Sequence, residues 1–139
     1  MAYMKNPRVQ TFLQTVRQQC KKCNVRFILS PGHEVNGGGE RCQGYFLEPW
    51  HARGQNGVLR VAVGGRRTSD WLYTLVHEYA HFLQWQRDDP IYREKDYYTL
   101  EAQTETEALE LCRKFKLPIP RRVLLKEHRK YMKKLAREC

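Results

Sequence analysis

Hydrophobic residues recur at helical spacing in four stretches of the chain. A period of about 3.6 residues is typical of amphipathic helices, which bury one face and expose the other. Thr68, Ser69 and Asp70 are candidate N-caps of the second helix, and Thr99 is the candidate cap of the third. The pattern predicts helices over residues 8–22, from about 68 to 83, over 99–116 and over about 120–139.

Three shorter stretches, at residues 25–29, 44–47 and 58–63, are typical of β-strands because they are rich in β-branched or aromatic residues and end near turn-forming residues. The glycines at 37–39 predict a hairpin or a loop. Together these elements predict one α+β domain over residues 1–139, with an N-terminal helix, a small and mainly antiparallel sheet, two helices that carry the chemistry and a C-terminal helix.

The second predicted helix carries the motif H-E-x-x-H at His77, Glu78 and His81. Residues four apart lie one turn above each other on a helix, so both imidazoles can reach one metal ion. The apolar positions of this helix cover another side, which places the histidines on a face that lines a cleft. Zinc hydrolases use this spacing, with the glutamate as general base. The motif predicts one Zn²⁺ held by His77 and His81, with Glu78 as the catalytic residue.

A catalytic zinc ion takes three protein ligands and keeps a fourth position open. No histidine follows the motif until His128, so a carboxylate of the third helix is the remaining choice. Glu101 and Glu105 fall on the apolar face of that helix, and Glu107 and Glu110 fall outside it. A buried carboxylate is costly unless a metal, an arginine or water compensates it. We predict Glu105 as the third ligand and keep Glu101 as the alternative.

The motif helix and the later segment together resemble a known family. The run from His77 to His81, followed by Glu105-Thr106-Glu107-Ala108 and by Leu117-Pro118, is similar to the small gluzincin-type zinc metallopeptidases of the ImmA/IrrE kind in bacteria and phages. The resemblance covers roughly residues 55 to 120. Family members commonly carry Asn or Asp four residues after the third ligand, where this chain has Leu109.

This resemblance implies a zincin-like fold and an intracellular zinc metalloendopeptidase that hydrolyses a protein or peptide substrate. His77, His81 and Glu105 would bind the zinc ion, and Glu78 would activate the water. The strand at 58–63 would be an edge strand that pairs with an extended substrate. Tyr97 and Tyr98 are candidates for stabilising the oxyanion, with plain packing as the other interpretation.

Charge is distributed unevenly along the chain, whose net charge is +10. Residues 113–139 hold eleven basic and two acidic residues, whereas residues 68–112 hold three basic and ten acidic ones. A basic C-terminal helix is typical of a solvated face, but it also fits nucleic acid or an acidic partner. The alternative function is therefore a zincin-like metal-binding module that binds such a partner through its basic tail without proteolysis.

Apolar runs and cysteine content indicate the cellular compartment in which the protein is expected. The sequence has no apolar run of transmembrane length and no signal-peptide pattern, so we expect a soluble cytoplasmic protein with no membrane partner. Five cysteines, an odd number, favour reduced thiols over a disulfide framework.

Overall fold

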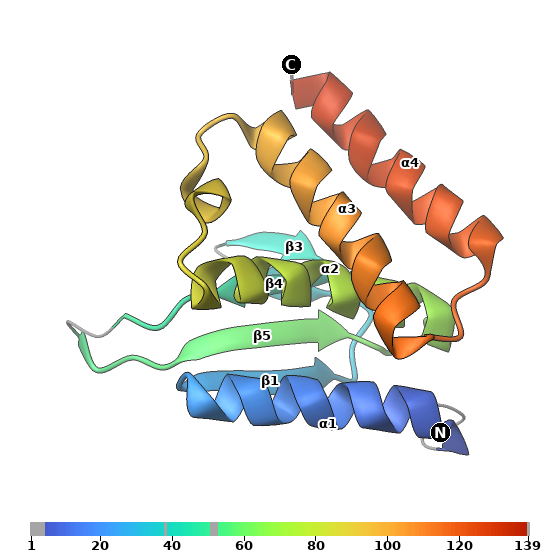
Figure 1. Cartoon of the computed structure of the whole chain (residues 1–139), viewed down its shortest axis with the longest axis horizontal. Helices are drawn as coiled ribbons and strands as arrows, with labels where there is room; N and C mark the ends of the chain where they lie inside the picture. The colour runs from blue at the N-terminus through green and yellow to red at the C-terminus, as the bar shows by residue number, and fades with distance from the viewer. Residues whose placement is uncertain (1–4, 38, 51–52, 139) are drawn as a thin grey trace.

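The chain folds into a small α+β domain of four α-helices and a small mixed sheet. The computed structural model describes residues 5–37, 39–50 and 53–138, with the backbone alone at residues 40 and 131–138. Figure 1 shows the helices and strands in their chain order. They are α1 (Pro7–Lys22), β1 (Val25–Ser30), β2 (Val35–Gly37), β3 (Glu40–Cys42), β4 (Gly44–Leu47), β5 (Gly57–Ala62), α2 (Thr68–Gln86), the short 3₁₀ helix η3 (Pro90–Arg93), α3 (Tyr97–Phe115) and α4 (Arg121–Glu138).

The three-stranded sheet has the order β1-β5-β4. β4 pairs with β5 in antiparallel fashion, but β1 pairs with β5 in parallel, so the prediction of a mainly antiparallel sheet is wrong for this pair. A parallel pair needs a long connection, which the intervening hairpin and β4 provide. β5 lies in the middle of the sheet, so the expectation of an edge strand at 58–63 is also wrong; β1 and β4 are the edge strands. β2 and β3 pair in antiparallel fashion with Gly37 opposite Glu40, as in a hairpin, and position 38 lies outside the described residues.

Helices cover one face of β5. Leu59 and Val61 are fully buried in the hydrophobic core, while Arg60 between them is only half-buried, as the two-residue period of a strand requires. α1 and α2 touch through an edge-on contact of Phe12 with Tyr79, whose ring centroids are 5.8 Å apart. The motif helix α2 is thereby held between the sheet and α3, and most of its apolar positions are buried as predicted.

The helix starts differ from the predicted caps. α2 begins after Arg67, which makes no side-chain cap hydrogen bond, so none of the three residues 68–70 serves as N-cap. α3 begins two residues before Thr99, and Asp96 is its cap because the carboxylate accepts from the amide of Tyr98. Asp and Asn side chains compete well for these exposed amides, and Asn6 does the same for α1.

α3 crosses α2, and α4 packs against both (Figure 1). The inward side of α4 includes Val123 and Glu127, which are 5% and 4% exposed. Among the described cysteines, Cys20, Cys23 and Cys112 are free thiols. Among the described residues, no helix combines the length and the apolar character that a membrane span requires.

Candidate metal centre

Three side chains from two helices converge at one point. His77 and His81 of α2 and Glu101 of α3 each offer an atom, and these atoms all lie within 4.8 Å of one another. The Nε2 atom of His77 is 2.9 Å from one oxygen of Glu101, and Nε2 of His81 is 3.3 Å from the other. Two imidazole nitrogens and one carboxylate oxygen form a donor set that could hold a metal ion.

Glu105, predicted as the third ligand, lies elsewhere. Its Oε1 atom is 2.6 Å from Nδ1 of His77, on the side of the ring that faces away from Glu101. The group that could hold a metal therefore contains the alternative, Glu101, and not Glu105. Both glutamates are buried as predicted, at 4% and 1% exposure. Helical periodicity places them on one face, but only the crossing of α3 over α2 decides which one meets the Nε2 atoms.

Glu105 lies behind the group on the same helix as Glu101. It stands four residues after Glu101 and hydrogen-bonds Nδ1 of His77. Carboxylates that accept from the outer nitrogen of a metal-binding histidine set its tautomer and orientation.

The second histidine is oriented by an amide. Gln84 is fully buried, and its Nε2 donates to Thr104 at 3.0 Å and to Glu107 at 2.7 Å. Its Oε1 therefore faces Nδ1 of His81, 3.3 Å away, and can only accept, so Nδ1 of His81 carries the proton. Nε2, which lies 3.3 Å from Glu101, is then the ring atom that would offer a lone pair to a bound metal ion. The sequence offered a signal for Gln84, since it lies three residues after His81 on the same helix.

Glu105 is the centre of a buried network. Besides His77 it accepts from the Tyr73 hydroxyl, and Nδ1 of His128 lies 3.3 Å from its Oε2. Burial and the Glu105 charge raise the pKa of Tyr73, so the phenol stays a donor. Tyr73 lies one turn before His77 on α2, so helical spacing could have indicated it, but it was not predicted. The contact of His128 could not be predicted in this way, because it depends on how α4 packs.

The histidine and glutamate side chains of the group shift one another's pKa values. Burial alone lowers the pKa of His77, but hydrogen bonds to Glu101 and Glu105 outweigh it and raise the pKa to about 10. Burial likewise works against ionisation of Glu101, and hydrogen bonds from the two histidines lower its pKa to about 2. The His77 ring thus lies between the side chains of Glu101 and Glu105, and two acidic side chains beside one imidazole suit a cation.

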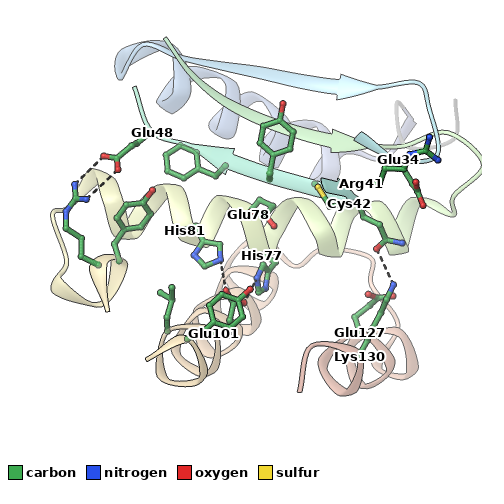
Figure 2. Close-up of a pocket in the computed structure, with 18 residues that line it drawn as sticks. Glu34, Arg41, Cys42, Glu48, His77, Glu78, His81, Glu101, Glu127 and Lys130 are labelled. Atoms are coloured by element: carbon green, nitrogen blue, oxygen red, sulfur yellow. Dashed lines mark hydrogen bonds and ion pairs between the residues drawn. The ribbon is translucent and has the colours of Figure 1, made fainter. Parts of the chain in front are cut away.

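The group opens onto a cavity of about 1170 Å³. His77, Glu78, His81 and Glu101 all line it, and Figure 2 shows them pointing into the same space. The wall opposite α3 is the edge strand β4. Glu78 thus lies beside the donor group but outside it, at the place where a base could reach a water molecule.

The two tyrosines predicted as candidates for stabilising the oxyanion differ in their position relative to the cavity. Tyr97 lines the cavity, whereas Tyr98 is not among the lining residues. Both are nearly half exposed, because they lie in the first turn of α3. Tyr92 of η3 also lines the cavity and was not predicted.

Comparison of the chain with family models, with curated proteins and with solved structures finds no match.

Proposed function

We propose that this protein is a zinc-dependent metallopeptidase that cleaves peptide bonds in its cavity. The observation that carries the proposal is the convergence of Nε2 of His77, Nε2 of His81 and a Glu101 oxygen within 4.8 Å at the wall of a cavity that Glu78 also lines. A structural metal site is normally closed by four protein ligands, whereas three ligands beside an open cavity are typical of catalysis.

The donor set fits zinc. His77, His81 and Glu101 would hold the ion, and Glu105 and Gln84 would keep both rings in the tautomer that binds metal. When bound, the ion supplies a Lewis acid that polarises the scissile carbonyl and lowers the pKa of water to about 7.

Glu78 is the group that moves the proton. Its carboxylate is half-buried in the cavity wall, where it would accept a proton from the attacking water and later deliver it to the leaving amine. Tyr97 is a candidate donor to the oxyanion because its side chain lines the same cavity.

The edge strand suits an extended peptide. β4 pairs with β5 on one side only, and its residues Gly44, Tyr45 and Phe46 line the cavity. A peptide can add to such an edge by main-chain hydrogen bonds while its side chains enter pockets on either side. Under this proposal β4 takes the substrate-pairing role that the resemblance implied for the strand at 58–63.

The decisive experiment measures metal content and proteolysis on the same preparations. Wild type is expected to take up one zinc ion per chain and to cleave peptides of a random library. Glu78→Gln should keep the zinc and lose cleavage, because it removes the base but no ligand. His77→Ala should lose both. Glu110→Gln, at an exposed position of α3, is the matched control and should change neither.

Two results would overturn the proposal. One is a wild-type protein that takes up no zinc, and the other is undiminished cleavage by the Glu78→Gln variant. Chelation followed by restoration with zinc separates loss of the ion from loss of the fold, since the far-ultraviolet circular dichroism reports the helices independently of activity.

A second candidate function is binding of nucleic acid or an acidic partner through α4 without proteolysis. The observation in its favour is that Glu127, the one acidic residue of α4 whose side chain is described, is buried, so the described side-chain charges on its exposed side are all basic. Such a surface attracts phosphates in a salt-dependent way. These exposed residues are Arg121, Arg122, Lys126, Arg129 and Lys130.

Fluorescence anisotropy with a labelled DNA duplex tests this candidate. Arg122→Glu combined with Lys126→Glu should weaken binding and reduce its salt dependence. Lys21→Glu combined with Lys22→Glu is the control, because these residues are equally exposed and basic but belong to α1, far from α4 in Figure 1. Equal loss in both variants would indicate attraction to net charge alone and would exclude α4 as the binding surface.

A further inference from the structure

A smaller hollow adjoins the large cavity. The smaller one has a volume of about 280 Å³ and shares Phe46, Glu48 and Tyr92 with the large cavity. This volume lies just below the range of about 300–1000 Å³ for pockets that hold drug-sized ligands, so it suits a single large side chain. Its other lining residues are Leu47, Trp50, Gln55, Asn56 and Val58.

The hollow is bordered by exposed apolar side chains. Leu47 is 50% and Trp50 is 52% exposed, at the end of the edge strand β4. Such apolar surface costs free energy in water, and when it is gathered at a cavity it marks a place where another molecule binds. Tyr97, 46% exposed, lines the neighbouring part of the large cavity.

The backbone of Trp50 is fixed by two hydrogen bonds across its loop. The amide of Trp50 donates to the carbonyl of Gln55 at 3.0 Å, and the amide of Gln55 donates back at 3.1 Å. The guanidinium of Arg53 lies 4.4 Å from the centre of the indole ring. A backbone that is already ordered loses little conformational entropy on binding, so this arrangement favours recognition.

The rim and the far end of the cleft are polar. Arg93 and Glu48 form an ion pair of 3.2 Å where the two hollows meet, which Figure 2 shows at one end of the cavity. The Arg93 side chain is 65% exposed and that of Glu48 is 38% exposed, so solvent weakens the pair and it can shift to admit a ligand. The opposite end carries Glu34, Arg41 and Lys130. The two ends therefore suit different side chains of one extended occupant.

We propose that the hollow beside Trp50 is a specificity subsite that takes one large apolar or aromatic side chain of the substrate peptide. The inference rests on the proposed peptidase function, because the hollow shares three lining residues with the cavity that His81 and Glu78 line. The substrate class is then a peptide segment with a bulky apolar residue at a fixed distance on one side of the cleaved bond.

The first experiment is a cleavage profile. Wild type with zinc is incubated with a random peptide library, and the products are sequenced by mass spectrometry. Large apolar residues should be enriched at one position relative to the cut. Trp50→Ala should lower kcat/KM for a peptide with Phe at that position about 10- to 100-fold, toward the value for its Ala counterpart.

Leu125→Ala is the matched control. Leu125 is 45% exposed, close to the value for Trp50, but it lies on α4 and lines neither hollow. It should leave the Phe preference unchanged. Cleavage without an apolar preference, or a preference that survives in Trp50→Ala, would overturn the subsite while the peptidase function stands.

A binding measurement separates the subsite from catalysis. The Glu78→Gln variant with zinc is mixed with two capped pentapeptides that differ only in a central Phe or Ala, and quenching of tryptophan fluorescence by acrylamide is recorded. Trp71 is 2% exposed and Trp85 is half-buried, so Trp50 dominates the quenching, and Trp50→Phe serves as the blank.

The Phe peptide should protect Trp50 from acrylamide and the Ala peptide should not. Protection together with a wild type that cleaves nothing would overturn the peptidase function and leave a peptide-binding groove. Equal quenching with both peptides would overturn the subsite.

Discussion

His77 and His81 lie one turn apart on the same helix, yet their surroundings differ. The His77 side chain is 2% exposed and both of its ring nitrogens face carboxylates. The His81 side chain is 14% exposed, and its outer nitrogen faces the neutral amide of Gln84 at 3.3 Å. The first therefore belongs to a closed wall of the site, and the second to its open side.

This difference has a physical origin in the packing of α3 and α4. Behind His77 lie Glu105, Tyr73 and His128, contributed by three helices. Toward His81 the first turn of α3 is exposed and the cavity continues to Tyr92 and Tyr97. A metal site needs rigid ligands on one side and access on the other, and here the two requirements are met by different histidines.

The largest effect is expected from removing the carboxylate that joins the two sides. Glu101→Ala should lower zinc affinity by more than about 100-fold, because it removes the carboxylate that we propose as the third metal ligand. A competition titration with a fluorescent zinc chelator measures this. Affinity close to wild type in Glu101→Ala, with loss in Glu105→Ala, would restore the original choice of Glu105 as ligand.

A smaller effect is expected from the closed wall. Glu105→Gln should lower zinc affinity about 10- to 100-fold, the range seen when a group that orients a ligand is changed. The amide presents one acceptor instead of two, so it cannot satisfy both His77 and Tyr73 as the carboxylate does. The same titration, with Glu110→Gln as control, reports the change.

The open side should be less sensitive. Gln84→Leu removes the acceptor for His81 across a longer contact, so the loss of zinc affinity should stay at or below about 10-fold. It should also lower the free energy of unfolding by about 1–3 kcal/mol, because Thr104 and Glu107 lose a buried partner. Urea unfolding measures that part. A loss of affinity larger than that of Glu105→Gln would contradict the ranking of the two sides.

The smallest effect is expected from chemical labelling of one thiol on the closed side of the site and one on the open side. Burial and the Glu105 charge raise the pKa of Cys112 to about 12, so at pH 8 this thiol is almost entirely protonated and unreactive. Cys42 lines the cavity and is only half-buried. Iodoacetamide at pH 8, followed by peptide mapping, should modify Cys42 well before Cys112 and leave the zinc content unchanged. Equal labelling rates would show that the wall opens in solution.

Much of the site could be predicted because it is local. The spacing of His77 and His81, the adjacent base and the inward face of Glu101 and Glu105 all follow from helical periodicity over a few turns. The choice between the two glutamates could not be predicted, since they differ by one turn and both face inward. The direction in which α3 crosses α2 makes that choice, and it depends on packing that no single helix contains.

The sheet shows the same division. The apolar residues of β5 predicted a strand. They did not predict its central position between a parallel and an antiparallel neighbour, because strand order depends on contacts between distant segments. By itself the amino-acid sequence determined which residues can do chemistry and on which elements they stand. Only the tertiary structure decided that Glu101 meets both histidines, that Glu105 stands behind His77, and that β4 borders the cavity, because these are relations between elements that pack together only in the complete fold.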